Sequence, residues 1–387
     1  MGAFSLAAPP ECGALFGFGK KPKKEASTEG LPGVKPERQV QPAADAQMRA
    51  RLGPAAIKVL YSAMEHEDPE IRSLAAQEWS RIGNPAARGV LEGALKDKNA
   101  YVRIAAAGGL MAMGDAKGVK DVESIVSRAP KLPGGTTRLA PVDEMRFITL
   151  NKVRVTAARS LGRMGAASSR DVLEKALGDD VGAVRDAAAA ALARMGEPVD
   201  LQDFVFALGS EDPSVRQQAV RALGEAGLKD KVPLLAPLAS DKEYPVRAEV
   251  MEALGKIGAE EALGALTKGA TDQNELVRAK AIEALGLVGS REAVPTLQTA
   301  RKTAGNVYVE LLAISALARL GVEVGAGEAQ RAVNQKDPDA RILAVGTLEH
   351  IGGTAALENL ETCLTDPEMK VRVRAAASLL KLLTEKR

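Results

Sequence analysis

A thirteen-residue pattern of apolar and polar positions returns ten times along the chain. In the copy VRQQAVRALGEAG, at residues 215–227, apolar residues stand one position before an arginine and three, four, seven and ten positions after it. This spacing forms one apolar stripe on an α-helix and is incompatible with the two-residue period of a strand. The pattern therefore predicts a chain built from helices.

The arginine of each copy marks the period. Successive markers are 31 residues apart, except for 51 between the second and third copies and 32 between the seventh and eighth. A near-constant period of this size is typical of a solenoid, in which each unit buries its apolar face only against its neighbours. The marker positions are Arg72, Arg103, Arg154, Arg185, Arg216, Arg247, Arg278, Glu310, Arg341 and Arg372.

Each copy also carries signals for the start and the end of its helix. Glycine follows the marker by eleven residues in nine copies, and glycine commonly ends a helix. Asp-Pro pairs such as Asp212 and Pro213 precede the marker, where aspartate caps a helix and proline is tolerated. A second, shorter helix fits before the next copy. We therefore predict an all-α, right-handed solenoid of about ten helix pairs at residues 49–387.

Two of the copies carry a family resemblance. The segments DPSVRQQAVRALGEAG and DQNELVRAKAIEALGLVG resemble HEAT-like repeats of the short bacterial type, named after phycocyanobilin lyases, and the resemblance covers about residues 54–387. It implies that each marker arginine pairs with a turn aspartate of a neighbouring unit, in a ladder that Glu310 should interrupt. It implies no single activity, because this repeat serves lyases, hydroxylases, glycosylases and scaffolds.

Composition narrows the classes of function. After residue 50 the chain carries 45 charges of each sign, and it has two histidines in all. HEAT-like glycosylases need a strongly basic groove, and the resemblance to deoxyhypusine hydroxylases would require four His-Glu pairs. No segment approaches the ~20 apolar residues of a membrane span. We expect no catalytic residue, metal, cofactor or nucleic acid partner.

A row of basic residues is one candidate binding surface. Nine positions after the marker, six of the ten copies carry a cation: Arg81, Arg163, Arg194, Lys256, Arg319 and Lys381. Cations near a helix C-terminus complement the helix dipole, at about 0.3–1 kcal/mol each. They would also form a track for an acidic segment of a partner. Both interpretations stay open, and we expect Arg163 and Arg194 to emerge side by side.

The added residues of the third unit are a second candidate. Residues 129–149, APKLPGGTTRLAPVDEMRFIT, contain prolines and glycines that predict a loop leaving the solenoid between two helices. Long surface loops cost little more than short ones, so the insertion can be merely tolerated. Alternatively it binds a partner through apolar groups such as Leu139, Met145 and Phe147.

The two ends of the chain complete the prediction. Residues 1–48 are rich in lysine and proline, and we expect them to be disordered. A signal remnant in this tail and a cytoplasmic location both stay open, with a slight lean to export. In the first copy Trp79 stands where the other nine have leucine, which predicts a cap over the exposed end of the core.

We conclude from the sequence that the protein is a monomeric scaffold or adaptor without enzymatic activity. It would bind another protein through the concave face of the solenoid, through the inserted loop, or through both. The alternative function is a bilin lyase-type subunit that handles a linear tetrapyrrole.

Overall fold

The computed structural model describes residues 46–83, 85–130 and 141–384. Most of the tail predicted to be disordered, and Leu139 of the predicted loop, lie outside this range. Across the described part the chain forms twenty α-helices, with short 3-10 segments and no strand. The helices follow one another as ten pairs, which confirms the predicted all-α solenoid.

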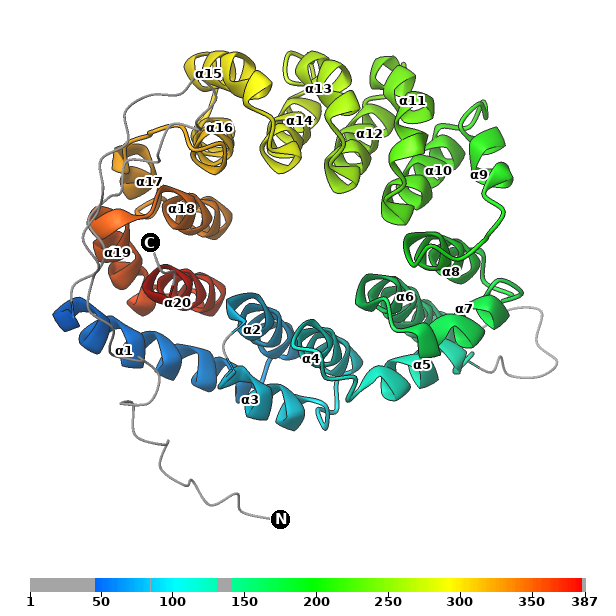
Figure 1. Cartoon of the computed structure of the whole chain (residues 1–387), viewed down its shortest axis with the longest axis horizontal. Helices are drawn as coiled ribbons and strands as arrows, with labels where there is room; N and C mark the ends of the chain where they lie inside the picture. The colour runs from blue at the N-terminus through cyan, green and yellow to red at the C-terminus, as the bar shows by residue number, and fades with distance from the viewer. Residues whose placement is uncertain (1–45, 84, 131–140, 385–387) are drawn as a thin grey trace, which may run out of the picture.

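The two helices of each pair belong to different layers (Figure 1). The outer layer holds α1 (Ala46–Met64), α3 (Ala87–Ala94), α5 (Val119–Ser127), α7 (Arg170–Ala176), α9 (Gln202–Ala207), α11 (Val232–Leu235), α13 (Leu263–Gly269), α15 (Val294–Lys302), α17 (Gly327–Ala332) and α19 (Gly353–Thr362). The inner layer holds α2 (Pro69–Ile82), α4 (Ala100–Ala112), α6 (Pro141–Met164), α8 (Gly182–Arg194), α10 (Pro213–Ala226), α12 (Tyr244–Ile257), α14 (Glu275–Val288), α16 (Val307–Arg319), α18 (Pro338–Ile351) and α20 (Met369–Thr384). The inner helices carry the repeated thirteen-residue pattern.

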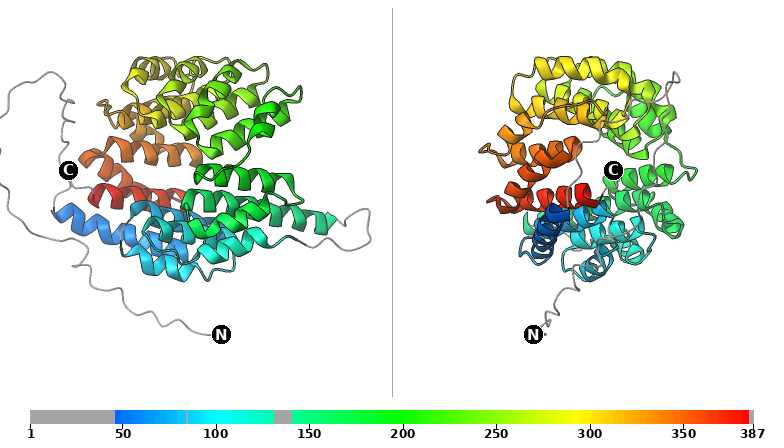
Figure 2. Two further views of the ribbon diagram at one scale, coloured as in Figure 1. Left: turned by 45° about the vertical axis from the view of Figure 1, so that its right-hand side comes forward. Right: turned by 60° about the vertical axis from the view of Figure 1, so that its left-hand side comes forward.

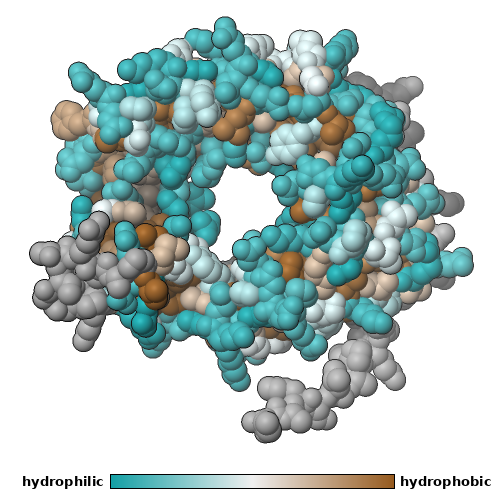
Figure 3. Space-filling view, turned by 180° about the vertical axis from the view of Figure 1, so that it is seen from behind, coloured by the Kyte–Doolittle hydropathy of each residue, from teal (hydrophilic) through white to brown (hydrophobic). Residues whose placement is uncertain are grey.

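The two ends of the solenoid meet, so the ten pairs close into a ring around an open hole (Figures 1 and 3). Helix α20 packs against both α1 and α2. Leu52 and Leu60 of α1 are buried, and Leu380 and Leu383 of α20 belong to the same apolar cluster. The periodicity predicts the helix pairs but not this closure, because it describes only contacts between consecutive units.

Closure changes the role of the first unit. Trp79 is 2% exposed, and its ring lies edge to face with that of Tyr61, with 5.4 Å between the ring centroids. Because the last unit packs on the first, this core has no free end to cover. The prediction that Trp79 is a terminal cap is therefore wrong, and the tryptophan fills the core next to the point where the ring closes.

The predicted helix signals act as expected in α10. Asp212 accepts a hydrogen bond from the backbone N–H of Ser214, and Pro213 occupies the first turn. Gly227 ends the helix with φ of 71°, in the left-handed region where a side chain would be strained. Similar turns reverse the chain between successive helices, so each inner helix returns beside the one before it.

The marker arginines form the ladder that the family resemblance implies. Arg216 donates from Nε and Nη2 to both carboxylate oxygens of Asp241, at 2.7 and 2.8 Å, and from Nη1 to the backbone carbonyl of Ser210 at 2.8 Å. The aspartate stands six residues before the next marker, and of the aspartates in these rungs Asp366 alone is part of an Asp-Pro pair. The rungs are Arg72–Asp97, Arg154–Asp179, Arg216–Asp241, Arg247–Asp272 and Arg341–Asp366.

The ladder is interrupted at Glu310, as the sequence predicts, but three marker arginines before the last copy also lack a rung among the described residues. Arg103 pairs with Asp121 of the following outer helix, and Arg185 donates to the backbone carbonyl of Asp179. Arg278 donates to the carbonyls of its own turn, at Asp272 and Gln273. In the part of the chain that the structure describes, Glu310 forms no side-chain hydrogen bond or ion pair with the next unit. Other polar contacts join the eighth unit to its neighbours: Asn306 donates to Glu275 of α14 at 2.7 Å, and Arg319 donates to His350 of α18 at 3.0 Å.

The insertion in the third unit differs from the prediction. Residues 141–149, expected to be part of a loop, form the first turns of α6, which extends to Met164. Pro141 is one of the prolines that predict a break, but a proline at the first position of a helix is tolerated because its missing N–H would have no intrahelical partner. Figure 2 shows α6 reaching beyond the neighbouring inner helices.

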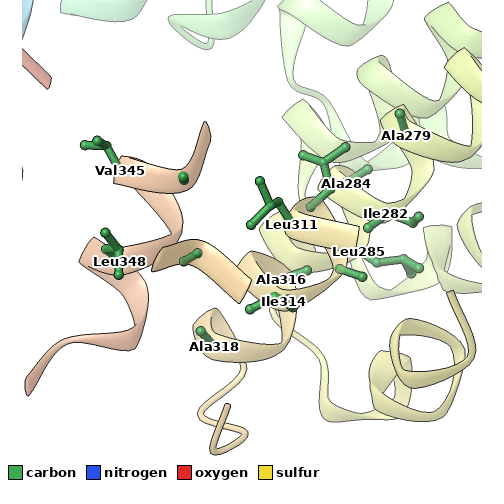
Figure 4. Close-up of a cluster of buried hydrophobic side chains, with 14 of the residues drawn as sticks. Ala279, Ile282, Ala284, Leu285, Leu311, Ile314, Ala316, Ala318, Val345 and Leu348 are labelled. Carbon is green, nitrogen blue, oxygen red and sulfur yellow. The ribbon is translucent and has the colours of Figure 1, made fainter. Parts of the chain in front are cut away.

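Small residues bring the regular inner helices close together. A Cβ atom added to Gly224 of α10 would lie 2.5 Å from Cβ of Ala253 on α12, and one added to Gly255 would lie 2.8 Å from Cβ of Ala284 on α14. The glycine stands eight residues after the marker and the alanine six. Figure 4 shows the alanine, leucine and isoleucine side chains that fill the core at α14, α16 and α18. We call the contact between such a glycine and alanine the glycine-alanine junction.

Candidate functional site on the inner wall

The luminal face of each inner helix lies opposite its apolar stripe, at two, five and nine positions after the marker. The predicted basic row is the third of these positions, so its members stand around the hole near the C-terminal ends of the inner helices. The row is interrupted by Ala112, Glu225, Leu287 and His350. Its six cations therefore have different surroundings, and only some of them are free to meet a partner.

At the closure of the ring the cations of the row already have partners. Arg81 and Lys381 both contact the buried carboxylate of Glu349, at 2.5 and 2.9 Å. Ser378 donates to Glu349 at 2.6 Å. On the other side Glu78 pairs with Arg81 at 2.6 Å and with Arg374 at 2.7 Å. We call this group the seam cluster, because it joins α2, α18 and α20.

The seam cluster holds the carboxyl group of Glu349 ionised. Burial alone would raise the pKa of Glu349, but Arg81, Ser378, Lys381 and Arg374 together lower it to about 2. Arg319, the next member of the row, donates from Nε to His350 at 3.0 Å. Burial and the Arg319 charge lower the pKa of His350 to about 4, so the imidazole is neutral at neutral pH. Arg81, Arg319 and Lys381 therefore make their contacts within the ring.

The remaining three cations of the row meet around one hollow of about 190 Å³. Arg163 of α6, Arg194 of α8 and Lys256 of α12 line it, together with Arg159 and the single carboxylate of Glu225. Arg194 donates to the backbone carbonyl of Glu225 at 3.4 Å. The sequence prediction that Arg163 and Arg194 lie close together therefore agrees with the structure. We call this hollow the basic hollow.

The charges around the basic hollow are only partly compensated. Arg159 pairs with Glu225 at 2.7 Å and Lys256 with Glu252 at 2.8 Å. Arg163 forms no hydrogen bond or ion pair with any described residue. Desolvation by the surrounding wall lowers the pKa of Arg163, although the charge of Glu225 opposes this effect. A guanidinium without a counter-ion in a confined site attracts anions.

A neighbouring hollow is less basic. Arg159, Arg221 and Glu225 line it with Asp186 of α8, and its volume is about 190 Å³. Arg221 is compensated by Glu249, which it contacts at 2.5 Å. Burial raises the pKa of Asp186. The positive field of the inner wall is therefore concentrated at the ends of α6, α8 and α12, around Arg163.

A wider hollow, of about 550 Å³, is also lined by Arg163 and lies between α2, α4 and α6. Ile104, Met111 and Met164 supply apolar wall, while Ser80 and Ser160 supply hydroxyl groups. We call it the wide hollow. Arg163 lines both hollows, so the two are neighbours on the inner wall.

The sequence of α4 explains the wide hollow. Met111 stands where the regular units carry the junction glycine, so α4 and α6 cannot approach as closely as α10 and α12 do. On the luminal face Gly108 supplies no side chain, and a Cβ atom added there would meet nothing closer than Met164 Cε at 3.8 Å. The sequence analysis missed this site because it followed the charged position of each copy and not the two junction positions.

The second predicted surface is only partly described. Val142 is 78% exposed and Met145 is 64% exposed on the extra turns of α6, where Phe147 is partly buried. Leu139 lies outside the described residues. Val142, Met145 and Ile148 are spaced three residues apart, so the three side chains share one helix face.

Three further properties of the described residues bear on function: metal binding, thiol reactivity and membrane spanning. No group of three or more His, Cys, Asp and Glu side chains is arranged to hold a metal ion there. Burial raises the pKa of the Cys363 thiol to about 11, so it is not a reactive thiolate at neutral pH. None of the described helices is long and apolar enough to cross a membrane.

Comparison with protein families identifies the repeat. The family of HEAT repeats matches residues 46–131, 150–212, 203–286 and 265–328, more than half of the chain. The chain belongs to the HEAT-repeat family. A comparison with curated proteins gives no match, so membership in the family is what the sequence comparisons establish.

Three solved structures resemble this HEAT-repeat chain at low identity. An engineered protein is 19% identical, with 86% of this chain and 100% of that chain covered and a TM-score of 0.32. Human deoxyhypusine hydroxylase in complex with glycerol is 21% identical, with 69% of this chain and 97% of that chain covered and a TM-score of 0.31. The complex of CpcE and CpcF of phycocyanin lyase from a Nostoc species is 17% identical, with 68% and 94% covered and a TM-score of 0.36. Such limited likeness carries no conclusion about activity.

Proposed function

We propose that this HEAT-repeat ring is a non-enzymatic adaptor whose inner wall binds an acidic segment of a partner protein. HEAT repeats are typical of protein-protein scaffolds. The observation that supports the acidic partner is the basic hollow, where four cations and one carboxylate line a single cavity. Arg163, which makes no direct ion pair with a described residue, is the group that gains most from an anion.

Charge reversal in the basic hollow tests this function. Replacing Arg163, Arg194 and Lys256 together by glutamate should leave the melting temperature almost unchanged, because exposed charges contribute little to folding. Capture of the partner from an extract of the source organism should weaken, because electrostatic attraction no longer speeds the encounter. The salt dependence of capture should also disappear, because salt screens only charge-driven attraction.

A matched variant controls for net charge. Lys175, Lys302 and Arg331 lie exposed on the outer helices α7, α15 and α17, and their replacement by glutamate changes the total charge equally. Capture should survive in this control. If both variants capture equally well with normal salt dependence, the basic row only complements the helix dipoles and binds no partner.

We also propose that the exposed face of α6 at Val142, Met145 and Ile148 makes a second contact with the partner. An exposed apolar group on a projecting helix is typical of interaction sites. The lyase-type alternative, which would handle a linear tetrapyrrole, rests on the repeat type alone. Visible absorbance of the protein after co-expression with a bilin would favour that alternative over the adaptor.

A further inference from the structure

We propose that the partner segment has two parts, an apolar side chain that enters the wide hollow and acidic side chains that lie along the basic hollow. This inference rests on the proposed function and names the chemistry of the segment more closely. The two hollows have different walls, and they meet at Arg163. A ligand that fills both must therefore change character along its length.

The dimensions favour an extended peptide over a compact ligand. From α4 to α12 the site crosses four steps between adjacent inner helices, about 40 Å at ordinary helix packing distances. An extended chain of about twelve residues covers this length. A small molecule would occupy only one hollow and leave the other without a partner.

The wall of the wide hollow suits an apolar anchor. Met111 and Met164 are flexible side chains that adapt to the shape of a bound group, and Ile104 adds a branched apolar surface. A Cβ atom on Gly108 would meet only side-chain atoms, of Met164 at 3.8 Å and Ser160 at 3.9 Å, so a leucine-sized side chain can enter the hollow without moving the backbone. The nearby hydroxyls of Ser80 and Ser160 can bind the peptide backbone beside the anchor.

The charges on the other side fix the position of the acidic part. Arg163 stands where the hollows meet, so the first acidic side chain should follow the anchor closely. Arg194 and Lys256 then face the next acidic residues. Asp186 lines the neighbouring hollow together with Arg159, and its carboxylate disfavours an acidic ligand there.

Two labelled peptides test the inference directly. Each has about twelve residues, with leucine in one and serine in the other at the anchor position. Four acidic residues follow the anchor directly, and a Gly-Ser segment leads to the label. Both are also made in the reversed order, because either chain direction fits the walls. In the better order, fluorescence anisotropy should give a Kd about tenfold lower for the leucine peptide, as expected for burying one leucine side chain.

Variants of Gly108 assign this difference to the wide hollow. Gly108→Leu should fill the space and weaken the leucine peptide to the level of the serine peptide, while the serine peptide binds unchanged. Gly108→Ala adds one methyl group at ordinary contact distance and serves as the control that retains most of the difference. Ala105→Phe, on the same luminal wall, is a second filling variant if Gly108→Leu does not fold.

The outcomes separate this inference from the proposed function. Arg194→Glu with Lys256→Glu should weaken both peptides by the same factor. If wild-type protein binds both peptides equally, the anchor is refuted and the acidic site remains. The anchor is also refuted if Gly108→Leu leaves the leucine advantage intact. If no peptide binds in either order, the proposed acidic site fails as well.

Discussion

Two kinds of contact join neighbouring inner helices in this ring. At the regular junctions, as between α10 and α12, a glycine of one helix lies against an alanine of the next, and the backbones nearly touch. At the closure between α18, α20 and α2 the same two positions hold Glu349, Ser378, Leu380 and Glu78. There a buried network of charged groups replaces the contact between small residues.

The two kinds of contact have different roles: one joins successive units, and the other joins the two ends of the ring. The glycine-alanine junction recurs at Gly162, Gly224, Gly255 and Gly286, so it repeats the step between units without fixing how many units there are. The seam cluster is satisfied only when α2, α18 and α20 all stand in place, because a buried carboxylate without its partners is costly. The closure thereby selects one arrangement of the two ends, while α1 and α20 add an apolar contact.

The largest expected effect is on the ring itself. Deleting residues 353–387 removes α19 and α20, and this exposes the apolar faces of both α18 and α1. Helical circular dichroism per residue should survive, since the other units still contact their neighbours. The melting temperature should fall by about 10 °C or more, and solubility should drop. Complete loss of helicity would contradict a fold made of neighbouring contacts, and an unchanged melting temperature would mean that closure adds no stability.

The next effect concerns the seam cluster and pH. The folded pKa of Glu349 is about 2, below its ordinary value of 4.5, so its contribution is fully present above about pH 4.5 and is lost as pH falls toward 2. That contribution is about 3 kcal/mol. Glu349→Gln should therefore lower the urea midpoint at pH 7, and the difference from wild type should shrink toward pH 2.

An exposed pair across the same closure is the control for Glu349. Glu361 pairs with Arg51 on the outer side, where both side chains are partly exposed. Such pairs contribute at most about 1 kcal/mol, so Glu361→Gln should have a small effect with little pH dependence. Equal effects of Glu349→Gln and Glu361→Gln would mean that burial of the seam cluster has no importance for stability.

A smaller effect should distinguish the regular junction from the wide hollow. Gly224→Ala places a Cβ atom 2.5 Å from Ala253 Cβ and 2.8 Å from its Cα, so we expect a loss of about 1–3 kcal/mol from overpacking. Gly108→Ala meets no close atom and replaces a glycine in a helix, so it should gain about 0.5–1 kcal/mol. Urea midpoints of the two variants measure the contrast, and the same sign for both would refute the distinction.

The sequence predicts the parts of this molecule that repeat. The apolar spacing, the glycine after each helix and the marker arginine suffice for ten helix pairs and for the interrupted ladder at Glu310. Closure escapes prediction because it depends on the accumulated curvature of many junctions. Yet Glu78 and Glu349 interrupt the small-residue positions of the pattern, and a buried charge there is the available signal of an unusual contact.

The site shows the same division. The basic row can be read from the sequence. Which of its cations pair within the ring cannot, because Arg81 and Lys381 meet Glu349 only where the ring closes. The wide hollow follows from Met111 in place of a junction glycine, together with the missing side chain of Gly108. Proline was a misleading signal in α6, because Pro141 begins a helix instead of ending one.

The smallest expected effect on stability is at the extra turns of α6. Replacing Val142, Met145 and Ile148 by serine should change the free energy of unfolding by less than about 0.5 kcal/mol, because exposed side chains contribute little to the fold. Phe206 on the outer helix α9 is 77% exposed, so Phe206→Ser is a control for loss of surface apolar area. Partner capture should fall in the α6 variant alone. A large drop in its melting temperature would show instead that these side chains pack on the ring, and equal capture by both variants would leave the luminal site as the sole partner contact.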